Sequence, residues 1–253
     1  MVYDIQKAGF WKRLSAWFLD VILVLVLSVG VALVLGSALR FNDHYDTMVS
    51  ISQEYAEEAG VSFDLTKEEY EALPEEERAT LDAAYEKFSQ DEQAIYAYNM
   101  VVNLSLMVAS LSIFLSYLIL EFMVPMIFKN GQTVGKKVFG LAIVRVNCVQ
   151  VDGVCMFVRS ILGKYTIETM VPVMLVIMVA WNILGIVGPI VIALLGLLQL
   201  ILLFATQNHS VIHDCLANTV VVDLHSQMIF GSESELIDYK KRIHEDIANR
   251  SSY

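Results

Sequence analysis

Hydrophobic residues in this chain gather in three long stretches that are nearly free of charge. The first, Leu14–Leu39, contains a single charged residue, Asp20. The second, Gln93–Leu120, has no Asp, Glu, Lys or Arg and continues to Phe128 past one acid, Glu121. An α-helix needs ~20 apolar residues to cross a bilayer, and both stretches exceed that length. We therefore predict one membrane-spanning helix in each.

The third stretch runs from Thr169 to His213 without Asp, Glu, Lys or Arg, which is too long for one span of ~20 residues. Helix-breaking residues lie near its middle, at Gly185 and Gly188-Pro189. We predict a helical hairpin there, with spans at about 161–184 and 186–206. The pattern therefore predicts an all-α polytopic membrane protein with four transmembrane helices.

A cleaved signal peptide is the competing interpretation of the first stretch. Lys7, Lys12 and Arg13 would form its basic start, and Gly36-Ser37-Ala38 would supply small residues for cleavage. The hydrophobic part of a signal peptide has only ~7–15 residues. Because 19 uncharged residues follow Asp20, we expect a retained membrane helix.

Charge predicts how the chain is oriented. The net charge is −11, yet the segment 40–92 alone holds 16 acidic and 4 basic residues. All 13 remaining Lys and Arg residues lie in the N-terminus, in the region 129–164 or in the C-terminal tail. The positive-inside rule places these regions in the cytoplasm. We predict a multi-pass protein of the cell (cytoplasmic) membrane, with both termini cytoplasmic and the acidic segment outside.

These boundaries divide the chain into six parts. They are the N-terminus with the first transmembrane helix (1–39), an acidic helical extracytoplasmic loop (40–97), the second transmembrane helix (98–128), a cytoplasmic loop with a β-hairpin (129–160), a transmembrane helical hairpin (161–206) and a cytoplasmic C-terminal segment (207–253).

The acidic loop shows helix signals. Thr66 with Glu69 matches the capping box, and Pro74 can open a second helix, which we expect to continue into the second span. Sixteen acids could attract cations. Charge runs are more often solvated surfaces, so we favour a helical extracytoplasmic insertion without a ligand.

The predicted cytoplasmic regions contain β-branched segments. Val138–Val146 and Val154–Val158 flank the turn signal Asp152-Gly153, and Thr219–Asp223 follows the last span. We predict that they form a small cytoplasmic β-element. The glycine-rich start, Gly131–Gly140, lacks the spacing of a phosphate-binding loop, and a tight turn is the favoured interpretation.

Two acids are predicted at similar depth in different helices. At 1.5 Å per residue, Asp20 and Glu121 each lie about 10 Å from the cytoplasmic end of their spans. Arg13 precedes Asp20 by two helical turns on the same face, which suggests an ion pair. A carboxylate inside a membrane span is costly and indicates a functional site. Pro125 would kink the second span and free a carbonyl as a cation ligand.

The third and fourth spans bring further charged residues to the depth predicted for Asp20 and Glu121. Lys164 and Glu168 have the i,i+4 spacing of a helical charge pair. Asp214 follows the fourth span, with His209 and His213 beside it as candidates for tuning a pH response. We expect Arg13, Asp20, Glu121, Lys164, Glu168 and Asp214 to converge on one pocket that faces the cytoplasm.

Two interpretations of this charged cluster remain open. The charges can be salt bridges that fix helix positions, since polar contacts commonly hold membrane helices together. Alternatively, buried carboxylates can exchange a proton for a small cation. The chain has no protease, hydrolase or metal-binding motif, and its basic segments are too sparse for nucleic acid. An enzyme is therefore the least favoured class, and no cofactor is expected.

Three segments resemble, in order, the conserved pattern of the RDD family of membrane proteins. They are Ala8–Asp20 (AGFWKRLSAWFLD), Gly131–Lys136 (GQTVGK) followed by Gly140–Val144 (GLAIV), and His213–Val221 (HDCLANTVV). The family is named for one arginine and two aspartates, which correspond here to Arg13, Asp20 and Asp214. Asn218 stands where the family often has Gly, and the acidic loop resembles an insertion.

The resemblance implies a membrane protein with a proposed transport role, and some members look like sodium–proton antiporters. Our first hypothesis is a cation–proton antiporter in which Asp20 exchanges ions, Glu121 and Asp214 assist, and Arg13 holds the charge of the site. Four spans are few for alternating access, so a homo-oligomer is expected. The second hypothesis is a non-transporting membrane adaptor or assembly factor that binds partner proteins through the β-element and the outer helices.

Overall fold

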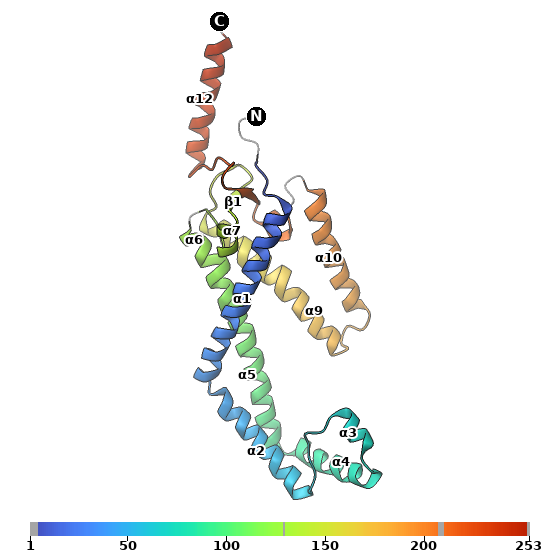
Figure 1. The fold of residues 1–253 in the computed structure, drawn as a ribbon. Helices are drawn as coiled ribbons and strands as arrows, with labels where there is room; N and C mark the ends of the chain where they lie inside the picture. Colours follow the sequence, from blue (N-terminus) through green and yellow to red (C-terminus); the bar gives the residue numbers. More distant parts are fainter. Residues whose placement is uncertain (1–4, 129, 207–209, 252–253) are drawn as a thin grey trace. The chain divides into compact units, whose positions relative to one another are not determined.

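The computed structural model describes residues 5–128, 130–206 and 210–251 and is largely helical (Figure 1). Contacts within the chain separate two compact units. One comprises Met1–Leu27 and Phe114–Tyr253, and the other comprises Ser28–Ile113. All the predicted charged residues described below belong to the first unit.

Within the described ranges, the four predicted membrane-length helices are present, which confirms the all-α polytopic architecture. They span Phe10–Ala38 (α1), Glu92–Ile127, Gly153–Ala180 and Val187–Ala205 (α10). The second consists of α5 (Glu92–Tyr117), η1 (Leu118–Met123) and α6 (Val124–Ile127), and the third consists of α8 (Gly153–Phe157), η2 (Val158–Met170) and α9 (Val171–Ala180). The predicted break between the last two spans falls where Asn182 and Gly185 adopt left-handed backbone angles.

The segments η1 and η2 are π-helical, with a wider turn than an α-helix. In η2, the hydroxyl of Thr166 donates to the carbonyl of Ile161, and that of Thr169 donates to the carbonyl of Lys164, both at 2.9 Å and five residues back. Short π-helical turns occur frequently at functional sites. Both segments carry charged residues of the predicted cluster.

A two-stranded antiparallel sheet confirms the predicted β-element. Strand β1 (Leu141–Arg145) pairs with β2 (Thr219–Asp223), so that Leu141 lies opposite Asp223 and Arg145 opposite Thr219. One face of the sheet packs in an apolar cluster with Ala16 of α1. The sheet therefore ties the chain before the third span to the chain after the fourth and places both beside α1.

The expected strand at Val154–Val158 is wrong, because this segment begins the third span as helix α8. The Asp152 carboxylate accepts a hydrogen bond from the Cys155 backbone N–H at 2.8 Å and caps that helix. The expected strand Val138–Val146 is shorter than predicted. Its first residue closes the short helix α7 (Val134–Val138), and Gly140, with φ of +66°, makes the turn into β1.

The second unit contains the acidic segment, folded into α2 (Phe41–Ala59), α3 (Lys67–Ala72) and α4 (Glu75–Gln90). The Thr66 capping box is confirmed. The expectation that the second helix continues into the second span is wrong, because Asp91 has an extended ψ of 126° and its carboxylate caps Ala94 at 2.8 Å. After the fourth span, the first unit adds α11 (Ile212–Leu216) and α12 (Glu233–Ser251).

Candidate functional site

Asp20 is buried in α1 and is held by the glycine-rich loop. Its Oδ2 accepts a hydrogen bond from the Thr133 hydroxyl at 2.5 Å, and its Oδ1 accepts one from the Gly135 backbone N–H at 2.8 Å. Lys136 Nζ lies 3.4 Å from Oδ2 and completes an ion pair. The buried carboxylate is thus surrounded by donors, as burial of a charge requires.

The loop sequence explains this geometry. Thr133 caps α7 and reaches Asp20 with the same hydroxyl. A Cβ atom at Gly135 would lie 2.8 Å from Asp20 Oδ1, so only glycine lets the backbone approach the carboxylate this closely. Gln132 donates through its side chain to the carbonyl of Leu141 at 2.6 Å and joins the loop to β1. The segment predicted as a tight turn therefore surrounds the Asp20 carboxylate with hydrogen-bond donors. We call Thr133, Gly135 and Lys136 the Asp20 cradle.

Glu121, which is predicted at a depth similar to that of Asp20, pairs with a different lysine. It is buried in η1 and forms an ion pair with Lys164 of η2. The carbonyl freed upstream of Pro125 is that of Glu121, and it accepts a hydrogen bond from Ser160 Oγ at 2.6 Å. That carbonyl is therefore engaged by the protein itself, contrary to its suggested part as a cation ligand.

Asp214 joins two arginines. Its Oδ1 forms an ion pair with Arg159 Nη1, which also donates to the Thr219 hydroxyl at the start of β2. Its Oδ2 lies 3.5 Å from Arg13 Nη2 of α1 and is a buried acceptor without a hydrogen bond. Asp214 therefore connects α1, η2 and the sheet.

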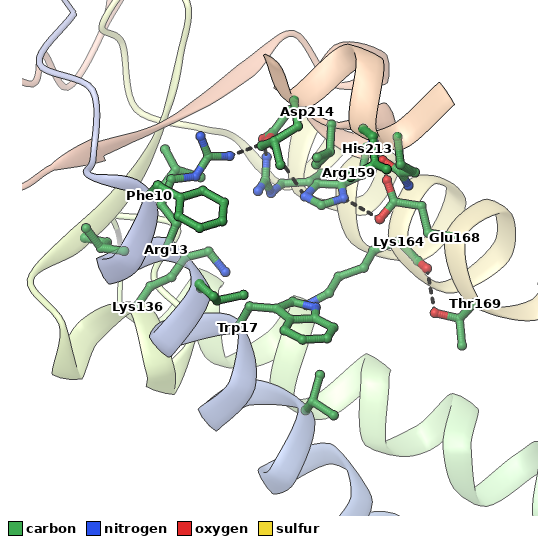
Figure 2. A pocket seen from close by; sticks show the side chains of 18 of the residues that line it. Phe10, Arg13, Trp17, Lys136, Arg159, Lys164, Glu168, Thr169, His213 and Asp214 are labelled. Carbon is green, nitrogen blue, oxygen red and sulfur yellow. Dashed lines mark hydrogen bonds and ion pairs between the residues drawn. The ribbon is translucent and has the colours of Figure 1, made fainter. Parts of the chain in front are cut away.

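Glu168 pairs with His213. The carboxylate oxygen Oε2 lies 2.7 Å from His213 Nδ1, and Oε1 accepts the His213 backbone N–H at 2.9 Å. Gly163 permits this packing of α11 on η2, since a Cβ there would lie 2.6 Å from the Cβ of His213. Figure 2 shows Glu168 and His213 on one side of the cavity and Arg13 on the other.

The structure corrects the predicted pairings. Arg13 pairs with Asp214 rather than with Asp20, and Lys164 pairs with Glu121 rather than with Glu168. An i,i+4 pair contributes only ~0.2–0.5 kcal/mol. A buried charge without a partner costs several times more, so partners from other helices take precedence. His209 lies outside the described residues.

The whole cluster is electrically balanced. Four acids (Asp20, Glu121, Glu168, Asp214) face four bases (Arg13, Lys136, Arg159, Lys164). Burial lowers the pKa of His213, which favours the neutral ring. Burial also lowers the pKa of Lys136, against the opposing effect of Glu121 and Asp20. Although burial alone would raise the pKa of Asp214, the neighbouring Arg159 holds it well below its usual range.

A cavity of about 570 Å³ lies within this cluster. Figure 2 shows Lys136, Lys164 and Arg159 around it, together with the rings of Phe10 and Trp17. Its lining comes from α1, the glycine-rich loop, η2, α10 and α11. Of the six residues expected to converge on one pocket, Arg13, Lys164, Glu168 and Asp214 line this cavity, whereas Asp20 and Glu121 are not among its lining residues.

Sequence reasoning missed Lys136 and Arg159. Charge balance could have revealed them, because the predicted cluster had four acids but only two bases. Such a buried cluster needs compensating cations, and the region 129–164 was the nearest source of them. Among the described residues, no group of three or more His, Cys, Asp or Glu is arranged to hold a metal ion.

Comparison with known protein families identifies a match over most of the chain. The model of the RDD family matches residues 7–218, which include Arg13, Asp20, Asp214 and the glycine-rich loop. No curated protein and no solved structure matches the chain.

Proposed function

Because the chain belongs to the RDD family, we propose that it is a secondary transporter of the cytoplasmic membrane, with both termini inside, that exchanges a small cation such as Na⁺ for a proton. The observation that carries the proposal is the Asp20–Lys136 ion pair. It joins a carboxylate inside a membrane-length helix to an amine whose pKa is lowered by burial.

This pair offers a balanced exchange. A cation that binds the Asp20 carboxylate must displace the Lys136 ammonium group, because both cannot occupy Oδ2. Lys136 then loses one proton to water and becomes a neutral amine, so one cation enters as one proton leaves. The Asp20 carboxylate, the Thr133 hydroxyl and the Ala16 carbonyl beside Gly135 supply oxygen atoms, which hard cations prefer.

The other charged residues support the pair in this proposal. Glu121 and Lys164 form a second carboxylate–amine pair of the same kind, and Asp214 pairs with both arginines. The ion pair with Asp214 keeps the positive charge of Arg13 near the start of α1. A homo-oligomer is expected, because four spans are few for alternating access.

A non-transporting membrane adaptor is the second candidate. It is favoured by the internal pairing of all four carboxylates, which is also what a purely structural network requires. Partner proteins would then bind to the sheet or to the acidic helices. The two candidates differ in one property: only the transporter needs Lys136 to lose its proton.

Lys136→Arg separates the candidates. Arginine can keep the ion pair with Asp20 but stays protonated, because a guanidinium group is not deprotonated in proteins. We expect purified Lys136→Arg protein in sealed vesicles to fold and to lose cation-dependent collapse of a pH gradient. The wild type should collapse the gradient when Na⁺, Li⁺ or K⁺ is added, and faster at alkaline pH, where neutral Lys136 is more populated.

Lys137→Arg is the matched control, since Lys137 is the adjacent lysine and is exposed. It should exchange ions as the wild type does. Asp20→Asn should abolish exchange in protein that still elutes as a single species. Folded wild-type protein that shows no flux with any of the three cations would reject the transporter and favour the adaptor.

A further inference from the structure

We propose that the 570 Å³ cavity holds the headgroup of an anionic phospholipid taken from the surrounding bilayer, with its phosphate on Arg13 and Arg159 and an acyl chain along α1 and α10. This inference goes beyond the proposed ion exchange and does not depend on it. It follows from the charge of the lining, the unused donors of the arginines and the apolar wall.

The charge of the lining favours an anion. Four cations line the cavity, Arg13, Lys136, Arg159 and Lys164, against the two acids Glu168 and Asp214. The other two acids of the cluster, Asp20 and Glu121, are not among the lining residues. The balanced cluster therefore presents an excess of positive charge to the cavity, which attracts an anion.

Arg13 and Arg159 both have N–H groups that donate no hydrogen bond within the part of the chain that the structure describes. Among the described residues, the Arg13 guanidinium makes no side-chain hydrogen bond and meets Asp214 only as a charge 3.5 Å away. The Arg159 guanidinium donates to Asp214 and Thr219 through Nη1 alone. A guanidinium presents five donors in a planar fork that matches phosphate oxygens. A phosphate between the two arginines would use these remaining donors.

One part of the cavity lining is an apolar wall that belongs to two membrane-length helices. Phe10 and Trp17 of α1 are each 47% exposed, and Leu200 of α10 is 55% exposed, although all three line the cavity. Figure 2 shows the two aromatic rings on the same side as Lys136 and Arg13. A water-soluble anion would leave this wall uncovered, whereas an acyl chain would cover it.

A second cavity extends the site. It has a volume of about 330 Å³, shares Phe10, Arg13 and Leu203 with the first, and adds Lys7 and the exposed Phe204. It therefore repeats the combination of a cation and apolar side chains at the beginning of α1. Basic pockets between membrane helices are known to bind anionic lipid headgroups.

The test uses the full-length protein purified in a neutral detergent. Phosphatidylglycerol, phosphatidylcholine and inorganic phosphate are added separately, and bound lipid is counted by native mass spectrometry alongside the melting temperature. We expect phosphatidylglycerol to bind and to raise the melting temperature, with little effect of phosphatidylcholine. Stabilisation by inorganic phosphate to the same extent would overturn the lipid proposal and indicate a site for a free anion.

Two variants test the two halves of the site. Arg13→Lys keeps the positive charge but loses the planar set of guanidinium donors. We expect about tenfold weaker binding of phosphatidylglycerol, equivalent to one charge-assisted hydrogen bond. Leu200→Gln removes part of the apolar wall without touching a charge and should also weaken binding several-fold. Leu194→Gln is the matched control on the same helix, because Leu194 is 58% exposed and lies outside the lining.

Equal binding of the two lipids, or equal binding by the Leu200→Gln and Leu194→Gln proteins, would overturn the proposal. The Leu200→Gln comparison stands even if Arg13→Lys fails to fold. Because no ion gradient is used, lipid binding can succeed where ion exchange fails, and the converse also holds. The two proposals therefore fail separately.

Discussion

Gly135 is the residue at which the smallest change should disturb the Asp20 cradle. An added methyl group at Gly135 would meet the Asp20 carboxylate and the Ala16 carbonyl. We expect Gly135→Ala to destabilise the protein by roughly 1–3 kcal/mol, as overpacking does in closely packed sites. Thermal unfolding in detergent measures this effect.

The control for this substitution is Gly196→Ala in α10, where nothing lies within 4 Å of an added Cβ. Because alanine is the better helix former, this change should be neutral or slightly stabilising. Equal melting temperatures for the two variants would contradict the cradle.

His213 predicts how stability responds to pH. Its pKa is lowered by burial, with Arg159 acting in the same direction. The unfolded chain therefore takes up a proton near pH ~6.5, where the folded chain does not. The contribution of His213 to stability should be constant above that pH and fall on acidification below it.

Replacing the ring tests this source of pH dependence. His213→Gln keeps a donor for Glu168 but cannot titrate, so its melting temperature should fall less between pH 7.5 and pH 5.5 than that of the wild type. Melting curves measured in matched buffers decide the matter. An identical pH dependence in both proteins would show that another group is responsible.

At the scale of elements, the hydrophobic pattern predicted all four spans, because crossing a bilayer imposes length and apolarity directly on the sequence. The strand at Val154–Val158 was mispredicted because β-branched residues also occur in membrane helices. In the structure, Asp152 caps the helix that this segment forms. The partners of the charged residues could not be predicted, because they are set by which helices pack together rather than by spacing along one helix.

Helix α8 should depend on Asp152. This carboxylate caps the helix through Cys155 and pairs with Arg145 of β1 at 2.6 Å. We expect Asp152→Ala to cost about 1 kcal/mol, mainly through the lost cap, because the exposed ion pair contributes little. Arg145→Ala separates the two contributions, since it removes the ion pair and leaves the cap.

Hydrogen exchange measures the outcome for Asp152. The amide of Cys155 should exchange faster in Asp152→Ala protein than in Arg145→Ala protein. Equal protection of that amide in the two variants would show that the cap has no part in forming α8.

At the scale of the whole molecule, electrical balance of the cluster should determine whether the protein folds. Asp214→Asn leaves Arg13 and Arg159 without their shared carboxylate, and breaking a buried pair in this way costs ~3–5 kcal/mol. We expect little monodisperse protein from this variant on size-exclusion chromatography.

Removing one of the two stranded charges should restore part of the loss. Asp214→Asn combined with Arg13→Gln is expected to yield more folded protein than Asp214→Asn alone, although Arg13→Gln by itself should lower the yield. A double variant no better than the single one would mean that Asp214 acts through shape rather than charge.

The pairing of β1 with β2 also has a consequence for biosynthesis. Ribosomes make the chain from its N-terminus, so Asp20 can meet Lys136 early, whereas Asp214 is made 55 residues after Arg159. Until Asp214 and β2 are made, Arg13 and Arg159 lack their shared carboxylate, and β1 lacks its partner strand. A nascent chain that stalls before Asp214 therefore holds two arginines without their shared carboxylate and a strand edge that is free to pair with another chain.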